Sequence, residues 1–548
     1  MSNKKKLRII PIGGLGEVGK NMTLYEYGDN ILIVDAGIMF PENDMIGIDY
    51  IIPDFHEYIG DKKDKVRGIV FTHGHEDHIG AVHHILDEVN VPMYATRLTR
   101  GLLEVKLNRY GLSGKADLRT VNAGESVQIG PFKVDFFHVC HSIPDGVGLG
   151  IETPAGLVVH TGDYKFDHTP VDNWPTDYAK LAEFANRGVL ALLADSTNAT
   201  EPGWTKSERV IDEALDRVFE EAPGRILVAT FASLISRMQQ VVNAAERHGR
   251  KIAFTGRSMV DNMKMARDLG YVEFPERLVI SLEKSLSMPD NQVVLMCTGS
   301  QGEPRSILGR LANGTNRKFD VREGDTIVLS SQIIPGNEES VYRTINNLFR
   351  RGANVIYEDI APVHVSGHAS QEEMKLLLHL VRPKYLIPIH GELRMLKQHA
   401  NLAEEVGLPK ENISIVENGQ VIEFSDGELN LSDRIPGGYI FVDGSGVGDV
   451  DRSIVREREI LGQDGAMMVH LEIDRESGQL KRKPEIITRG FMLSDDLDEV
   501  MKGIFERLKK SVQKANGNVE RAVLQSLKDY FYKETKRSPF IFVAIDES

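Results

Sequence analysis

One short segment, from Thr72 to His78, concentrates side chains that bind metals. It contains His73, His75, Asp77 and His78, and it follows a short apolar run that reads as a buried strand. Imidazole and carboxylate are ligands that zinc prefers, and a loop at a strand end can direct several of them at one point. Packing these groups together without a ligand would be costly, so the segment predicts a metal site.

Three more candidate ligands lie further along the chain, each just after a predicted strand. They are His141, Asp163 and His390. Taken alone, none of them indicates a metal, because an isolated histidine is more often a core or a surface residue. Glu76, inside the first segment, is not expected to be a ligand.

A glycine-rich turn, Gly14–Gly19, formally matches a dinucleotide-binding fingerprint, with Asp35 downstream. The context differs, since a strand-like run, Met22–Tyr27, follows the glycines where a helix would be required. We therefore predict a turn near the metal site. Four further histidines are expected behind the ligands or at the surface: His83, His84, His160 and His168.

The elements that must position these side chains are mostly strands. Apolar or alternating runs precede the candidate residues at Ile31–Val34, Arg67–Phe71, Phe132–His138, Gly156–His160 and Lys384–Ile389. From about Lys206 to Asn354, short strands alternate with helical patterns, which is typical of a parallel sheet with helical crossovers. The predicted fold class is α/β, with a separate α/β domain in the middle of the chain.

The last part of the chain, residues 454–548, combines strands with two charged amphipathic helices and is predicted to be a small α+β domain. Its first helix places Val500, Ile504, Leu508 and Val512 at three-to-four spacing. This stripe would either pack on the domain's own sheet or also support self-association, and the sequence leaves both open.

Charge and composition bear on the type of partner, the role of the cysteines and the cellular location. A net charge of −15 argues mildly against a nucleic-acid partner, although a metal pair and a local basic groove can reverse the sign where it matters. The two cysteines, Cys140 and Cys297, form no CxxC pair, so a disulfide or a cysteine zinc site is not expected. A reducing cytoplasm is the natural location, and no apolar run is long enough to span a membrane.

The order of the candidate ligands resembles the metallo-β-lactamase superfamily: HxHxDH, then His, Asp and a distant His. The resemblance implies two Zn²⁺ per chain. The first zinc would be held by His73, His75 and His141, the second by Asp77, His78 and His390, and Asp163 would bridge them. Asp35 matches a carboxylate that orients the ligand loop from behind.

The spacing narrows the resemblance to the β-CASP branch, whose members cleave nucleic acids. Between Asp163 and His390 lie enough residues for an inserted domain, and the branch's further motifs match Asp195 and His368. These two residues would transfer the proton to the leaving oxygen, and the sequence leaves open which one donates it. A histidine at position 390 favours RNA over DNA.

Several motifs are similar to the bacterial ribonuclease J family: Gly13–Glu17, Asp35–Gly37, His141–Asp145, Gly299–Pro304 and Pro388–Glu392. The family implies a metallo-β-lactamase αββα sandwich (residues 1–200 and 356–448), an inserted β-CASP domain (201–355) and the C-terminal α+β domain. It further implies a zinc-dependent ribonuclease with 5′-to-3′ exonuclease and endonuclease activity. Such an enzyme leaves 5′-phosphates and acts in RNA maturation and decay.

An exonuclease must recognise the RNA end, and the substrate would be single-stranded RNA with a 5′-monophosphate. The segment His364, Val365, Ser366, Gly367 and His368 offers backbone N–H groups as an anion-binding nest. Ser233 could line the same pocket. The alternative for Ser233 and Ser366 is an ordinary helix cap, and both interpretations stay open.

The remaining expectations concern partners and a second metal. The family resemblance implies a homodimer or homotetramer, association with a paralogue, and a place in an RNA-decay complex. A Ca²⁺ site is a further hypothesis where Gly47 and Asp49 would meet Asp443, because carboxylate and carbonyl oxygens suit that ion.

Two rival functions remain at this point. One is a metallo-β-lactamase-fold hydrolase of esters or thioesters, which the length of the insertion and His368 disfavour. The other is a non-catalytic subunit of an RNA-decay complex, whose signature would be a lost ligand. All seven ligand positions are occupied by suitable residues here.

Overall fold

The structure is a computed structural model that describes residues 6–42, 44–474, 476–477, 479–491, 494–514 and 518–547. The chain divides into two compact units. The first contains the N-terminal part up to Phe40 and the long stretch from Ile51 to Ile440. The second contains Pro41–Tyr50 and the chain from Phe441 onward.

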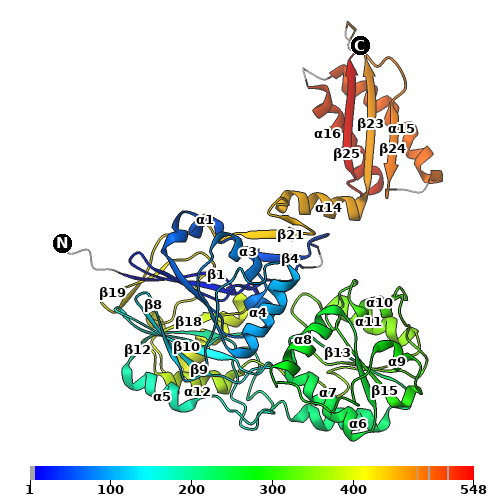
Figure 1. The fold of residues 1–548 in the computed structure, drawn as a ribbon. Coiled ribbons are helices and arrows are strands. Elements are labelled where there is room, and N and C mark those ends of the chain that lie inside the picture. Colours follow the sequence, from blue (N-terminus) through cyan, green and yellow to red (C-terminus); the bar gives the residue numbers. More distant parts are fainter. Residues whose placement is uncertain are drawn as a thin grey trace. The chain divides into compact units, whose positions relative to one another are not determined.

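The first unit contains a sandwich of two sheets (Figure 1). The eight-stranded sheet has the order β20 (Glu428–Leu431), β19 (Ile422–Ser425), β1 (Leu7–Gly13), β2 (Met22–Tyr27), β3 (Ile31–Val34), β5 (Val66–Val70), β6 (Met93–Ala95) and β7 (Leu118–Thr120). The six-stranded sheet has the order β18 (Tyr385–Ile389), β12 (Val189–Asp195), β11 (Gly156–His160), β10 (Val147–Thr153), β9 (Phe132–His138) and β8 (Ser126–Ile129).

Strand periodicity explains the layers, because successive side chains point to opposite faces of a sheet. Phe136 and Leu193 face the core between the two sheets. Their chain neighbours, Phe137 and Leu192, face a second core against helices on the outer side of the six-stranded sheet. These helices are α5 (Tyr178–Arg187), α12 (Gln371–Val381) and α13 (Leu393–Glu405). The near-continuous apolar runs in the sequence therefore reflect strands buried on both faces.

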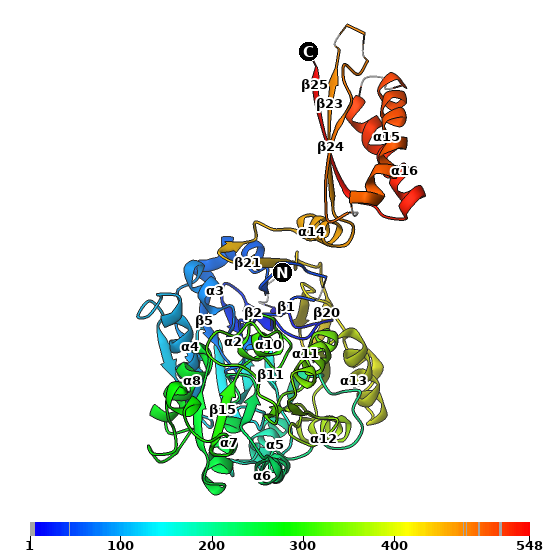
Figure 2. The ribbon, with the colours of Figure 1, turned by 90° about the vertical axis from the view of Figure 1, so that its right-hand side faces the viewer.

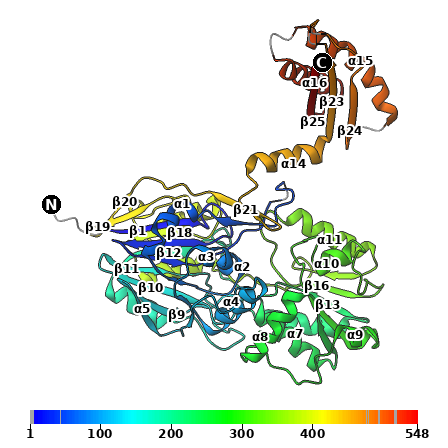
Figure 3. The same ribbon diagram turned by 45° about the horizontal axis from the view of Figure 1, so that its top comes forward.

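The middle of the chain adds a five-stranded parallel sheet with helices on both faces (Figures 1 and 3). Its order is β14 (Lys251–Phe254), β15 (Val293–Cys297), β13 (Ile226–Ala229), β16 (Thr326–Leu329) and β17 (Asn354–Ile356). The helices are α6 (Val210–Glu221), α7 (Ile235–Arg247), α8 (Arg257–Asp268), α9 (Leu282–Leu286), α10 (Ile307–Ala312) and α11 (Glu338–Arg350). The alternation of strands and helices confirms the predicted α/β class.

Shorter elements lie between the strands of the first unit: α1 (His56–Ile59), α2 (Glu76–Ile79), α3 (Val82–Glu88) and α4 (Arg97–Arg109). Two short helices, α2 and α3, thus follow strand β5. Two strands, β4 (Tyr50–Pro53) and β21 (Tyr439–Asp443), lie where the chain passes from one unit to the other.

In the second unit, β22 (Gly446–Val447) pairs with β21 and is followed by α14 (Arg452–Asp464). A three-stranded sheet follows in the order β24 (Glu485–Arg489), β23 (Ala466–Ile473) and β25 (Phe540–Glu547). Two helices, α15 (Ser494–Lys514) and α16 (Val519–Thr535), cover one face of this sheet (Figure 2).

The apolar stripe on α15 packs within its own unit. Ile504, Leu508 and Val512 are buried in one core with strand β23 and helix α16. The side chain of Val500 lies outside the described residues. Packing on the unit's own sheet, the first of the two alternatives for this stripe, therefore accounts for it.

Among the described residues, no helix combines the length and the apolarity that crossing a bilayer would need.

Candidate metal centre and catalytic residues

The predicted ligands gather where strands of the two facing sheets end. The segment from His73 to His78 follows β5, Asp163 follows β11, and His390 follows β18. Strands β11, β12 and β18 run parallel, so their carboxyl ends meet at one edge of the sheet. This edge is the usual place for a site in an α/β sheet.

The first group of ligand atoms contains three imidazoles and one carboxylate. The group consists of His73, His75, His141 and Asp163. His75 Nδ1 lies 3.2 Å from His73 Nε2 and 3.1 Å from His141 Nε2. The Oδ2 atom of Asp163 lies 3.5 Å from His73 Nε2 and 3.7 Å from His141 Nε2.

The second group contains Asp77, His78, His390 and again Asp163. His390 Nε2 lies 3.2 Å from Asp77 Oδ2 and 3.7 Å from Asp163 Oδ1. His78 Nε2 lies 3.2 Å from Asp163 Oδ2. The structure therefore brings together all seven predicted ligands, in two groups that share Asp163.

These spacings fit zinc. Two nitrogens bound to one tetrahedral zinc at about 2.0–2.1 Å lie about 3.3 Å apart, close to the separations in the first group. The Oδ1 atom of Asp163 is buried and has no hydrogen-bond partner within the described part of the chain. Buried polar atoms are rarely left without a partner, so this oxygen is suited to a second metal ion.

The ring nitrogens that point away from the centre are held by the protein. His78 Nδ1 lies 2.8 Å from Asp35 Oδ2, His141 Nδ1 donates to the Gly367 carbonyl at 2.7 Å, and His390 Nδ1 lies 2.6 Å from the Thr197 hydroxyl. Such contacts fix the tautomer and aim the other nitrogen at the metal.

Asp35 lies where the sequence predicts, behind the ligand loop. Besides contacting His78, its carboxylate accepts hydrogen bonds from the Thr72 N–H and hydroxyl, both at 2.8 Å. Asp35 and His390 adopt the left-handed region, with φ of 62° and 51°. Such strain in non-glycine residues is typical of functional sites, where the surrounding structure holds it in place.

The two groups of histidines differ in proton affinity. Burial lowers the pKa of His73, His75 and His141, that of His75 to about 4. Burial also opposes the charged forms of His78 and His390, but the Asp163 and Asp77 carboxylates outweigh it. They raise the pKa of both residues, that of His390 to about 9. Metal binding at the second group must therefore displace protons at neutral pH.

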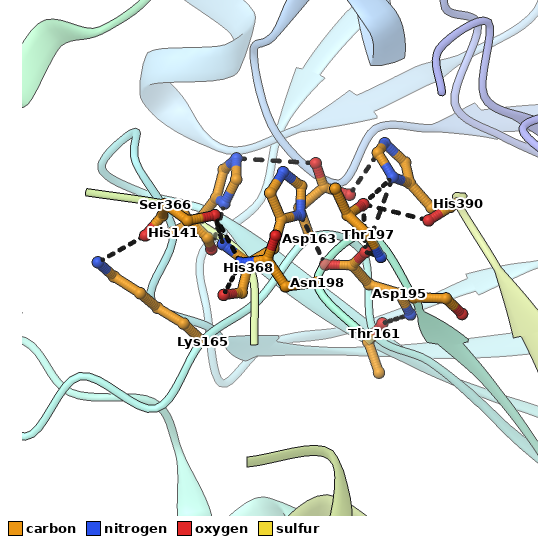
Figure 4. Close-up of polar contacts among 12 residues, drawn as sticks. His141, Thr161, Asp163, Lys165, Asp195, Thr197, Asn198, Ser366, His368 and His390 are labelled. Carbon is orange, nitrogen blue, oxygen red and sulfur yellow. Dashed lines mark hydrogen bonds and ion pairs between the residues drawn. The ribbon is translucent and has the colours of Figure 1, made fainter. Parts of the chain in front are cut away.

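Asp195 and His368 form a hydrogen-bonded pair beside the second group (Figure 4). His368 Nδ1 donates to Asp195 Oδ2 at 2.7 Å, and the other carboxylate oxygen accepts from the Thr197 N–H and hydroxyl. Burial lowers the pKa of His368, but the charge and hydrogen bond of Asp195 outweigh it and raise the pKa above its ordinary value. The pair can hold a proton next to the candidate metal ligands.

The segment from His364 to His368 lies against the first group. Gly367 has no room for a side chain, because a Cβ there would lie 2.5 Å from ring atoms of His141. Ser366 accepts from the Asn198 amide at 2.8 Å and from the His368 N–H at 3.2 Å. The Ser366 hydroxyl is therefore held by Asn198 and by the segment's own backbone, and Val365 is buried.

Ser233 belongs to the inserted domain, and His364 lies close enough to Arg237 of that domain to feel its charge. His364 is 7% exposed, and its Nδ1 atom has no hydrogen-bond partner among the described residues. Burial, together with the charges of Arg237 and Lys165, holds its pKa well below the usual range. Ser233 precedes α7, whose N-cap is Leu234 without a side-chain cap, so Ser233 does not cap that helix.

The residues of the calcium hypothesis surround the positively charged guanidinium of Arg458. Arg458 Nη2 lies 2.7 Å from Asp443 Oδ2, and Nη1 donates to the Ile46 carbonyl. A Cβ at Gly47 would lie 2.7 Å from this guanidinium, and Asp49 accepts from the Gly444 N–H. Calcium binding here stays a prediction.

The histidines set aside from the sequence take no part in the two groups. His83 and His160 are buried, and His160 Nδ1 contacts the Tyr25 hydroxyl at 2.9 Å. His84 is half-buried and His168 is exposed. The sequence analysis did not identify Thr197, Asn198 and Lys165 as site residues. They belong to no metal-binding motif, and they reach the site only because the fold brings distant parts of the chain together.

Comparison with known families matches the chain in four consecutive regions. The metallo-beta-lactamase superfamily matches residues 15–198, and the ribonuclease J beta-CASP domain matches 223–348. A "Zn-dependent metallo-hydrolase RNA specificity domain" matches 352–416, and the ribonuclease J C-terminal domain matches 453–548.

Individual relatives match over nearly the whole length. Ribonuclease J2 of Bacillus subtilis is 42% identical, with 100% of this chain and 99% of the relative covered. Ribonuclease J of Thermus thermophilus is also 42% identical, covering 99% and 95%. A solved structure of a protein of unknown function from Enterococcus faecalis is 16% identical and covers 76% of this chain and 100% of its own. Its TM-score of 0.54 shows likeness of fold alone.

Proposed function

Since the chain belongs to the ribonuclease J family of metal-dependent RNA hydrolases, we propose that it uses two zinc ions to cut RNA both from the 5′ end and internally. The observation that carries this proposal is the pair of ligand groups sharing Asp163, with Asp195 and His368 beside them. The ester or thioester hydrolase and the non-catalytic subunit are both disfavoured by the family match and the complete ligand set.

The ligand residues would divide as the resemblance implies. His73, His75 and His141 would hold one zinc, Asp77, His78 and His390 the other, and Asp163 both. When bound, two zinc ions lower the pKa of water to about 7 and offset the negative charge of the phosphate. The protein's own part is to bind the phosphodiester, to orient it and to supply a proton.

We assign the proton donor to His368. Its Nδ1 atom donates to Asp195, which leaves the Nε2–H as the group that can reach the substrate. This proton would go to the leaving 3′-oxygen as the P–O bond breaks, so that the product carries a 5′-phosphate. Asp195, fully buried, would orient the ring and stabilise its charged form.

The segment from His364 to His368 is the proposed subsite for a 5′-monophosphate. It is supported by the unpartnered nitrogen of buried His364 and by the position of the segment against His141. Ser233, which caps no helix, would line the same subsite. A subsite sized for one phosphate excludes a triphosphate, so single-stranded RNA with a 5′-monophosphate would be the preferred substrate.

We also propose self-association through the second unit, as a homodimer or homotetramer. Support comes from the sheet face that α15 and α16 leave uncovered. Met468 lies opposite Ile487 on one neighbouring strand and Phe542 on the other. These side chains are 45%, 53% and 52% exposed, which forms an apolar row. Substituting Met468→Asp should lower the molar mass by light scattering, whereas an unchanged mass would contradict this role.

We make three further proposals, on partners, location and calcium. Association with a paralogue or an RNA-decay complex follows from the family resemblance. A cytoplasmic location is supported by Cys140 and Cys297, which are buried free thiols. Calcium near Asp443 would have to displace Arg458, so calorimetric titration with Ca²⁺ alone would test it.

A direct test of the proposed function uses one RNA in several forms. The zinc-loaded chain should degrade 5′-monophosphorylated RNA stepwise and cut a circular RNA of the same sequence internally. Cleavage of an aryl ester or thioester without cleavage of either RNA would overturn the proposal.

A further inference from the structure

A buried cluster of charged residues lies behind the proposed 5′-phosphate subsite. Lys165, Glu208 and Arg237 are 1%, 4% and 2% exposed. Lys165 follows the ligand Asp163, Glu208 precedes α6, and Arg237 lies on α7 of the inserted domain. Buried charges need well-placed partners, because desolvation is otherwise costly. The contacts of this cluster therefore indicate which parts of the chain its charges hold in place.

Arg237 anchors the start of the segment. Its Nη1 atom donates to the Val363 carbonyl at 2.9 Å, and the Ser330 hydroxyl donates to the same oxygen at 2.6 Å. Its Nη2 atom pairs with Glu208 Oε2 at 2.8 Å, and Nε donates to Gln240 Oε1. Each of the three guanidinium nitrogens therefore has its own partner. Lysine, with a single ammonium group, cannot reproduce this planar arrangement.

Lys165 anchors the middle of the segment (Figure 4). Its Nζ atom donates to the Ser366 carbonyl at 3.1 Å and to the Lys206 carbonyl at 3.2 Å. Glu208 Oε1 lies 3.5 Å away, while the other oxygen of the same carboxylate faces Arg237. Glu208 thus links the two cations that hold the segment.

The consequence is that carbonyl oxygens of the segment are turned into the protein. Besides Val363 and Ser366, the Gly367 carbonyl accepts from His141 Nδ1, and the His368 carbonyl accepts from the Thr205 hydroxyl at 2.7 Å. A phosphate would be repelled by these oxygens and attracted by N–H groups. His364, with its unpartnered nitrogen, lies between the two anchors.

We propose that Arg237, Glu208 and Lys165 are positioning residues that shape the segment from Val363 to His368 into the 5′-phosphate subsite. Two of the three, Glu208 and Arg237, belong to the inserted domain, so recognition of the RNA end depends on how that domain seats against the segment. His368 itself is held separately by Asp195 and Thr205, so the chemistry depends less on the cluster. The inference rests on the proposed function.

The test compares Arg237→Lys with a matched substitution, Arg225→Lys. Arg225 also forms a buried ion pair in the inserted domain, 2.5 Å from Asp325, and it donates a further hydrogen bond to the Asp320 carbonyl, which lies outside the segment. Each variant is assayed on linear RNA with a 5′-monophosphate, linear RNA with a 5′-hydroxyl, and circular RNA. Zinc content and thermal unfolding are measured on the same samples.

Arg237→Lys should reduce the ratio of 5′-monophosphate to 5′-hydroxyl cleavage at least about tenfold, with a smaller loss on circular RNA. Lys165→Met should act in the same direction, and Arg225→Lys should leave the ratio at its wild-type value. If Arg237→Lys does not fold, Ser330→Ala removes one donor to the Val363 carbonyl and one acceptor of Arg237, and it should lower the ratio less.

An unchanged ratio in folded Arg237→Lys or Ser330→Ala would overturn the inference, as would an equal loss on circular RNA. Failure of the proposed function would look different, because the wild-type chain would then cleave none of the three RNAs.

Discussion

The metal centre and the segment from Val363 to His368 lie side by side but are built differently. The predicted ligands follow strand ends directly, and four of them come from one short segment. The segment that begins at Val363 has no helix or strand, and its shape depends on side chains from distant parts of the chain. A site placed by strand ends can be recognised from a short pattern, whereas a site shaped by scattered anchors cannot.

Loss of the shared ligand Asp163 should reduce RNA cleavage most. Replacing Asp163 by Ala removes the carboxylate that the two groups share, so RNA cleavage should fall to background and zinc content should drop. Thermal unfolding of the metal-free protein, measured on the same samples, checks that the fold is retained. The exposed His168→Ala serves as control. Full cleavage by Asp163→Ala would break the proposed division of ligands.

A smaller loss is expected at the proton donor. His368→Ala should slow RNA cleavage by about 10²–10⁴-fold with zinc content unchanged, since it removes a general acid and no ligand. On bis(p-nitrophenyl) phosphate, whose leaving group needs no proton, the loss should be much smaller. Equal losses on both substrates would argue against His368 as the donor.

The next effect concerns the RNA end. RNA with a 5′-monophosphate should be degraded about tenfold faster than the same RNA with a 5′-triphosphate, equivalent to about 1.4 kcal/mol of discrimination. Steady-state cleavage of end-labelled RNA measures this directly. Equal rates on the two ends would mean that the segment from His364 to His368 does not recognise the terminus.

A smaller effect is expected on the pH dependence of zinc binding, in which the two ligand groups should differ. The pKa of His390 is raised to about 9, so this ring is protonated at pH 7 and must lose its proton to bind metal. The pKa of His75 is lowered to about 4, so its ring is already neutral. Zinc affinity of the second group should therefore rise with pH between 7 and about 9. Calorimetry in two buffers would detect the released protons, and pH-independent binding would contradict the assignment.

Local patterns were sufficient to predict the α/β class, the inserted domain's alternation and the metal-binding segment from His73 to His78, whereas His141, Asp163 and His390 were assigned through the family resemblance. The support of the site was not predictable in the same way. Thr197 and Asn198 contact His390 and Ser366 through the fold, and nothing in their sequence context indicates this. The hypothesis of a calcium site at Asp443 did not consider Arg458, whose guanidinium contacts the Asp443 carboxylate and the Ile46 carbonyl.

The stripe on α15 illustrates a different limit. Amphipathic spacing predicted a buried face but could not tell whether the unit's own sheet or another subunit covers it. Ile504 and Leu508 pack in the unit's own core, while the exposed apolar row lies on the opposite face of the sheet, at Met468. Alternation in short strands is too brief to reveal which face remains uncovered.

The proposed function requires that two zinc ions held by these seven residues drive RNA cleavage. The most direct measurement is elemental analysis of the purified chain, with RNA cleavage assayed on the same sample before and after chelation. We predict about two zinc ions per chain, loss of cleavage on chelation, and recovery when zinc is returned. A chain stripped of all transition metal that still cleaves RNA at its original rate would contradict the claim.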